Sequence, residues 1–237
     1  MMLHTAEIYI LLFFIYAILG WTMEVVCKLV EKKKFINRGF LIGPYCPIYG
    51  YGALLITILL NRYTNDPIAL FVMGIVVCSI LEYLTSYFME KLFHARWWDY
   101  SQRKFNINGR ICLRTMIPFG LLGLFMMYIS NPFFFSIIEK IPNNELDIIC
   151  VILLIIYFID NIISFNIIRN VNITSQKIKD NTEEITEEVA EDLTKKVKEI
   201  LERKSVLHRR LIHAFPEMKM KIKSKIEESK EKMKKVK

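Results

Sequence analysis

The chain has 237 residues, 53% of them hydrophobic, and it carries a formal charge of +8. Apolar residues fill positions 8–168, whereas charge gathers in short connectors and in the segment after Arg169. None of the nine glycines belongs to a G-x-x-x-x-G-K-[ST] phosphate loop, so this chain is not an ATPase. The five cysteines are scattered without a C-x-x-C pair. We therefore assign them to neither a metal site nor a disulfide, and we expect no cofactor.

Five segments are apolar enough for membrane helices, since a span needs about 20 mostly apolar residues to cross ~30 Å of hydrocarbon. The predicted helices cover 7–29, 44–61, 67–90, 113–131 and 146–168. The first segment lacks a basic start and a cleavage site, so it is a retained helix and not a secretory signal. The predicted fold class is all-α, a polytopic transmembrane domain over residues 1–170 followed by a charged helical tail over 171–237.

Lys and Arg alternate among the connectors, and this alternation predicts the orientation of the helices. Residues 28–38 and 91–114 are rich in bases, whereas the first ten residues hold none. The two remaining connectors hold one base each, Arg62 and Lys140. The bias predicts an N-terminus outside the cell membrane and a C-terminus in the cytoplasm.

A dense run of Gly and Pro precedes the second helix. The stretch NRGFLIGPYCPIYGYG (37–52) holds four glycines and two prolines, which disfavour regular helical hydrogen bonding. Non-helical backbone at membrane depth is tolerated only where it is buried in protein or lines a wet cavity. We expect a bent or re-entrant entry whose Tyr45 and Tyr49 hydroxyls face a polar cluster. An ordinary interfacial turn is the alternative.

Ionisable residues of several predicted helices fall at one depth, in the cytoplasmic half of the bundle. The third helix places Glu82, Ser86 and Glu90 at four-residue steps on one face. A charge in hydrocarbon costs at least ~2.5–3.5 kcal/mol on insertion scales, so it usually faces partners or water. We therefore predict a substrate-binding or coupling site here. Its candidate residues are Glu24, Asn37, Arg38, Tyr45, Tyr49, Glu82, Glu90, His94, Arg96, Trp97, Trp98, Asp99, Arg110, Arg114 and Asp160.

Two plainer interpretations of these residues stay open. Arg114 is the nearest predicted cation for Glu82 and Asp160, so the three side chains are alternatively a structural brace. Trp97 and Trp98, taken singly, are typical of anchors at the membrane interface.

The tail separates its charges by sign. Residues 180–192 contain seven acids and no base, whereas 204–237 contain twelve bases and four acids. Apolar residues at three- and four-residue spacing predict amphipathic helices on either side of Pro216. The basic helix suits contact with anionic lipid headgroups, and a solvated extension without a partner is the alternative. Nucleic acid is not expected, because the tail has almost no aromatic residues for base stacking.

Three blocks resemble a known family of bacterial membrane proteins. They are NRGFLIGPYCPIYGYG (37–52), LEYLTSYFMEKLFHARWWDYS (81–101) and FNINGRICL (105–113). They are similar to signature blocks of the ABC-transporter permeases of type IV (CmpB-like), over roughly residues 5–170. The resemblance implies a permease component. Because this chain lacks a phosphate loop, a separate ATP-binding subunit would then dock on its cytoplasmic connectors.

Two other classes of function remain. A membrane enzyme would use His94 with Asp99 or a glutamate as acid and base on a lipid or phosphate headgroup. The chain has neither H-E-x-x-H nor G-x-S-x-G, so we expect a protein that is not an enzyme. A regulatory or scaffold protein would use the tail as its working part. A homo-oligomer is compatible with each class.

The orientation is testable by cysteine labelling in intact cells, in a variant whose native cysteines are replaced. We expect an impermeant thiol reagent to react with a cysteine placed at Asn65 or Asn143, because both connectors are predicted to face outward. A cysteine at Ser101 should react only after the cells are opened. Labelling at Ser101 in intact cells would contradict the predicted topology.

Overall fold

The computed structural model describes residues 2–33, 39, 41–93 and 97–181, and helices make up most of this part of the chain. The helices are α1 (Met2–Lys32), α2 (Pro47–Leu59), the short η1 (Asn61–Tyr63), α3 (Pro67–Phe93), α4 (Leu113–Phe125), the π-helical η2 (Met126–Ser130), α5 (Asn131–Ile138) and α6 (Asn143–Asn181). A two-stranded antiparallel hairpin, β1 (Asn106–Ile107) and β2 (Ile111–Cys112), precedes α4.

Four helical stretches in the described part of the chain are long and apolar enough to cross a membrane. They are Thr5–Glu31, Pro67–Leu92, Leu113–Ile138 and Asn143–Asn166. Helix α2 has 13 residues, so at 1.5 Å per residue it extends only ~20 Å, short of the ~30 Å of hydrocarbon. It begins at Pro47, which suits the first helical position because proline has no N–H to leave unpaired. The predicted helix at 44–61 is therefore present but shorter than expected.

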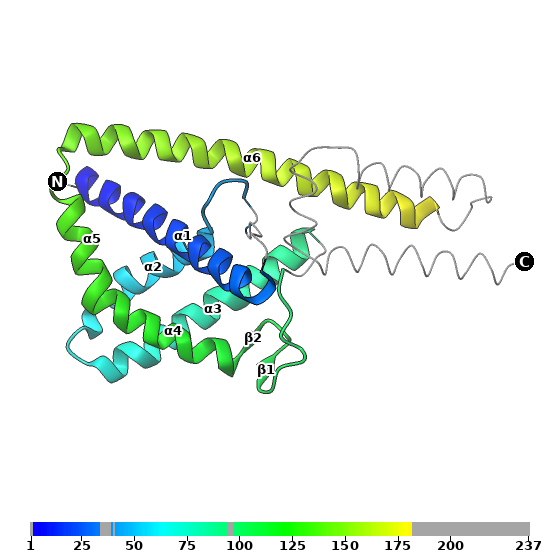
Figure 1. The fold of residues 1–237 in the computed structure, drawn as a ribbon, viewed down its shortest axis with the longest axis horizontal. Coiled ribbons are helices and arrows are strands. Elements are labelled where there is room, and N and C mark those ends of the chain that lie inside the picture. The colour runs from blue at the N-terminus through cyan, green and yellow to red at the C-terminus, as the bar shows by residue number, and fades with distance from the viewer. Residues whose placement is uncertain (1, 34–38, 40, 94–96, 182–237) are drawn as a thin grey trace, which may run out of the picture.

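The fourth predicted helix is longer than its expected end at residue 131. Pro132 lacks an N–H and its ring crowds the carbonyl four residues earlier, which normally interrupts a helix. Here the π-helical turn Met126–Ser130 comes directly before it, and such a turn accommodates the missing hydrogen bond. The chain therefore continues through α5 to Ile138 with a change of direction (Figure 1).

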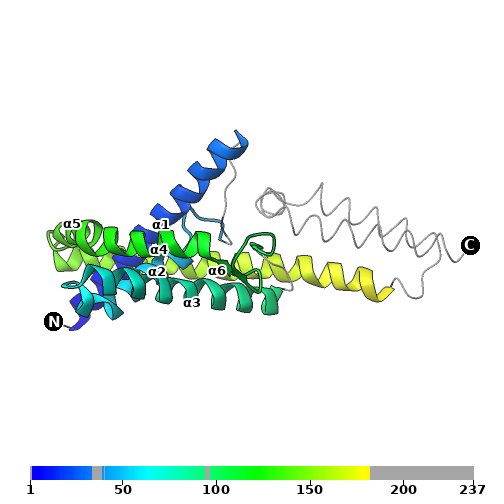
Figure 2. The same cartoon turned by 90° about the horizontal axis from the view of Figure 1, so that it is seen from below.

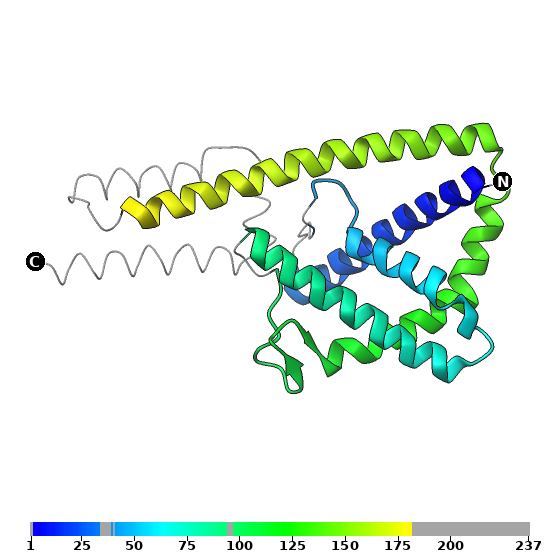
Figure 3. The same cartoon turned by 180° about the vertical axis from the view of Figure 1, so that it is seen from behind.

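Helix α1 begins beside the junction of α5 and α6, and α6 runs along one edge of the molecule (Figure 1). Leu11 of α1 packs there with Ile138 and Leu146 in a small apolar cluster. Helices α2, α3, α4 and α6 form a slab, from which the second half of α1 projects (Figure 2). Helix α2 lies between α1 and α3 (Figure 3).

Glycines allow close contact between the helices of this slab. A Cβ added at Gly74 of α3 would lie 3.7 Å from the Gly120 Cα and 4.0 Å from the Gly123 Cα of α4. Small residues at such crossings let helix backbones approach, which is how helices associate in a bilayer.

A buried hydrogen-bond network joins α1, α2 and α5. The Tyr16 hydroxyl lies 2.7 Å from Asn131 Oδ1 and 2.8 Å from Ser130 Oγ. The Asn131 amide donates to Thr57 Oγ1 at 2.9 Å, and Thr57 in turn donates to the Ala53 carbonyl at 2.7 Å. Every side chain of the network thus has a partner, as buried polar groups require.

Helix α6 crosses the predicted domain boundary at residue 170 without a break and ends at Asn181. The rest of the predicted tail lies outside the described residues. Its amphipathic helices and its contact with anionic lipid stay predictions.

The α1–α2 contact yields a matched pair of variants. In Gly50→Ala the new methyl would lie 2.6 Å from the Phe13 carbonyl oxygen, so the two backbones must separate. In Gly52→Ala the nearest atom is Leu81 Cδ2 at 3.5 Å, an ordinary contact. Both changes gain the same helix propensity, so the difference reports packing. We expect Gly50→Ala to be less stable than Gly52→Ala by about 1–3 kcal/mol, measured by unfolding in detergent. Equal stability would contradict the close contact.

Candidate functional site

Asp160 of α6 fixes the segment that leads into α2. Its Oδ1 accepts hydrogen bonds from the Ile42 N–H and the Ser164 hydroxyl, both at 2.9 Å. Its Oδ2 accepts from the Gly43 N–H at 2.7 Å and the Tyr45 hydroxyl at 2.6 Å. Asp160 is only 7% exposed, and among the described residues these donors, and no cation, stabilise its buried carboxylate. Asp160 thus acts as a cap for the segment before α2, because it accepts hydrogen bonds from backbone amides that have no partner within a helix.

The same segment brings Tyr49 to a second carboxylate. The Tyr49 hydroxyl donates to Glu24 Oε1 at 2.9 Å. Gly20 makes the approach feasible, because a Cβ there would lie 2.2 Å from Tyr49 Cγ. Residues 41–46 before α2 are not helical, and the Tyr45 and Tyr49 hydroxyls both contact carboxylates. They face two different carboxylates, however, and not one cluster.

Glu82 is a buried carboxyl that contacts hydroxyl groups from the connector and from α4. Its Oε1 accepts from the Tyr100 hydroxyl at 3.2 Å, and its Oε2 lies 3.4 Å from Thr115 Oγ1. Glu82 is 7% exposed, and it is near enough to Glu24 for the two charges to repel each other. Burial and then the neighbouring Glu82 raise the pKa of the Tyr100 hydroxyl, so Tyr100 remains a donor at neutral pH.

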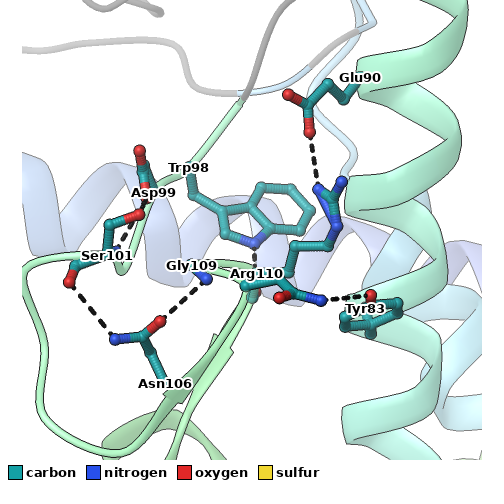
Figure 4. A network of polar contacts seen from close by, with 9 residues as sticks. Tyr83, Glu90, Trp98, Asp99, Ser101, Asn106, Gly109 and Arg110 are labelled. Atoms are coloured by element: carbon teal, nitrogen blue, oxygen red, sulfur yellow. Dashed lines mark hydrogen bonds and ion pairs between the residues drawn. The ribbon is translucent and has the colours of Figure 1, made fainter.

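Glu90, two turns further along α3, has a cation as its partner. Arg110 Nη1 lies 2.7 Å from Glu90 Oε2. The same guanidinium lies over the rings of Tyr83 and Tyr87, with Cζ 5.6 and 5.5 Å from their centroids. The Trp98 indole N–H donates to the Arg110 carbonyl at 3.0 Å, so Arg110 links the connector to α3 (Figure 4).

The connector is organised by a tight hairpin turn. Asn108 and Gly109 have positive φ values of 52° and 67°, and the Arg110 N–H donates to the Ile107 carbonyl at 3.0 Å. This is the geometry of a type I′ turn, for which Asn-Gly is a preferred pair. The Asn106 side chain fastens the hairpin, since its Oδ1 accepts from the Gly109 N–H (Figure 4) and its amide donates to the Arg103 carbonyl at 2.6 Å.

The structure divides the predicted site residues into separate groups. Glu24, Tyr49 and Glu82 lie together, Glu90 pairs with Arg110, and Asp160 binds Tyr45. Trp97 and Trp98 are half-buried, whereas Asp99 is exposed and bonds with Ser101 in the connector. Asn37, Arg38, His94 and Arg96 lie outside the described residues.

The brace of Arg114 with Glu82 and Asp160, the alternative interpretation of these residues, is not seen in the described structure. Arg114 is exposed, and Thr115, the next residue on α4, contacts Glu82 instead. Neighbouring residues on a helix point about 100° apart, so the two side chains cannot face α3 together.

Sequence reasoning missed three features of this region. The hairpin carries a recognisable signal, Asn108-Gly109 between residues that pair as strands. Tyr100 belongs to the block 81–101, but nothing in the sequence distinguishes it from the other aromatic residues there. Thr115 had no signal at all, because a lone threonine at a helix start is ordinary.

Apolar helices of spanning length with carboxylates buried between them define an integral, multi-pass membrane protein. The model of the family described as "Putative ABC-transporter type IV" matches residues 11–165. That match covers more than half of the chain, and the chain belongs to this family. No curated protein and no solved structure matches it.

The role of Asp160 as a cap predicts a large loss of stability when it is removed. Asp160→Ala leaves the Ile42 and Gly43 amides and the Tyr45 hydroxyl without their acceptor, at ~1–3 kcal/mol for each buried group. Asp147→Ala, on the exposed part of the same helix, is the control and should change little. Unfolding in detergent measures both. Equal stability of the two variants would show that Asp160 is not a cap.

Proposed function

We propose that this chain is the permease component of an ABC-type transporter in the cytoplasmic membrane. Its five passes would place the N-terminus outside and the C-terminus in the cytoplasm. The alternation of Lys and Arg among the connectors supports this orientation, and membership of the ABC-transporter family supports the class of function.

The second of the five passes would consist of α2 together with the irregular residues 41–46 before it. The six residues 41–46 reach at most ~20 Å, which added to α2 is enough for the hydrocarbon. Backbone at that depth needs internal partners, and it has them. The Ile42 and Gly43 amides bond to Asp160, and the Cys46 N–H donates to the Ala17 carbonyl at 2.8 Å.

The observation that carries the proposal is the buried carboxyl of Glu82, with Glu24 beside it, next to the connector at the cytoplasmic ends of the helices. Among the described residues its hydrogen-bond partners are hydroxyl groups and no cation. Ionisable groups within membrane spans are costly to bury, and they commonly mark substrate or ion paths. Glu82, Glu24, Tyr49 and Tyr100 would form the substrate or coupling site, which we call the Glu82 site.

The hairpin supports a docking place for the separate ATP-binding subunit. Phe105 is 79% exposed and Ile107 52% exposed, beside the exposed bases Arg103 and Lys104. Phe105 also has a positive φ of 54°, a strained conformation for an aromatic residue. A strained and exposed aromatic residue on a tightly bonded hairpin suits an interface anchor. Arg110 belongs to the same hairpin, and Tyr100 of the same connector contacts Glu82. Docking of a partner at the hairpin would therefore affect the Glu82 site.

Affinity purification of the native complex tests this function. We expect an ATP-hydrolysing protein to co-purify in stoichiometric amount with the unaltered chain. Phe105→Ala should reduce the retained partner about tenfold or more, because truncating an aromatic anchor typically costs ~2 kcal/mol or more. Phe133→Ala is the matched control, since Phe133 is 58% exposed on α5, away from the connector.

The outcomes separate the classes of function. If no ATP-hydrolysing protein co-purifies with the unaltered chain, the permease proposal is contradicted and an enzyme or scaffold is favoured. If the partner is retained equally by Phe105→Ala and Phe133→Ala, the hairpin is not its docking place.

A further inference from the structure

Glu82 has no basic neighbour in the described part of the chain. Arg110 is engaged by Glu90 and two tyrosine rings, and Arg114 is exposed. The titratable groups that interact with it come from three elements. They are Glu24 of α1, Cys78 of α3 itself and Tyr100 of the connector, with Cys112 at the start of α4 acting on Tyr100. Each of these gains negative charge on ionisation, so none of them compensates a carboxylate at Glu82.

The hydrogen-bond geometry around Glu82 also favours a neutral carboxyl group over a carboxylate. Thr115 Oγ1 has one proton, and it lies 2.9 Å from the Cys112 carbonyl oxygen but 3.4 Å from Glu82 Oε2. A carbonyl only accepts, so the shorter contact takes that proton. Glu82 Oε2 then faces a hydroxyl oxygen, and a favourable contact requires the carboxyl to donate. Oε1 meanwhile accepts from Tyr100. The neutral acid satisfies both oxygens, whereas the carboxylate satisfies one.

We infer that Glu82 is a proton-binding site, in which the resting protein holds a neutral carboxylic acid between Tyr100 and Thr115. The ligand is a proton taken from water. Binding forms the Oε2–H bond of Glu82. Release returns the proton to water and leaves a carboxylate that keeps the Tyr100 hydrogen bond. The inference deepens the proposed function, on which its consequence for transport rests.

Two further buried hydroxyl groups lie on the same face of α3, where they would serve as a path for that proton. Ser79 and Ser86 are 5% and 4% exposed, and among the described residues neither hydroxyl has a hydrogen-bond partner. Buried polar groups normally do have partners, so an exception calls for an explanation. Ser86 stands one turn from Glu82 and one turn from Glu90, whose side chain is 27% exposed. A hydroxyl in that position both accepts and donates, as a relay between a buried acid and the surface must.

Infrared spectroscopy of the full chain in a bilayer tests the inference directly. At neutral pH we expect a carboxylic-acid carbonyl band that shifts in D2O and is lost in Glu82→Gln. Glu139→Gln should keep it, because Glu139 is exposed at the end of α5. Tyr100→Phe removes the donor to Oε1 but not the acid, so it should move the band to higher frequency. Ser86→Ala should slow the exchange of the acid proton for deuterium.

The inference fails if the unaltered protein shows no acid band at neutral pH. It also fails if the band persists in Glu82→Gln, or if Tyr100→Phe leaves its frequency unchanged. Because the band is recorded in the resting protein, a proton site in a chain without an ATP-hydrolysing partner would support this inference while contradicting the permease.

Discussion

The irregular segment that leads into α2 depends on one carboxylate that accepts backbone hydrogen bonds. Residues 42 and 43 are not helical, and in a bilayer their amides would have no water to bond with. Asp160 provides the acceptor, from a different helix. Because the carboxylate replaces water as the hydrogen-bond acceptor, the chain can pass through an irregular stretch before α2 begins at Pro47. Beyond this segment, the Tyr49 hydroxyl of α2 meets Glu24 of α1.

The connector between α3 and α4 is the second organising element, and it works by side-chain bonds more than by burial. Asn106, Asn108 and Gly109 close the hairpin, while Asn108 and Arg110 bind it to Tyr83 and Glu90 of α3. The half-buried Arg110 of the connector pairs with Glu90 and is therefore not available to Glu82. Glu82, two turns deeper, therefore meets hydroxyl groups. Two glutamates on one helix face thus have different environments, and this difference follows from where one short hairpin places its arginine.

Sequence reasoning reached the helices and their order, because these follow from apolar length. It also anticipated the irregular entry to α2, since Gly and Pro leave little alternative there. It failed where the outcome depends on side-chain direction across elements. Arg114 and Thr115 are adjacent, and only the rotation of α4 against α3 decides which one reaches Glu82. The position of the π-helical turn before Pro132 was equally out of reach, because nothing in MMYIS distinguishes a wide turn from a regular one.

Helix α6 is a continuous rod of 39 residues, which at 1.5 Å per residue is about 58 Å long. Little of its membrane-length segment is covered by the rest of the described protein. Asp160 lies near its middle and holds residues 42 and 43 by their amides. Asp160 thus attaches α6 to the bundle, and the helix continues beyond it to Asn181. Any torque applied to this later part of α6 would therefore reach the backbone that leads into α2, with Asp160 as the point of attachment.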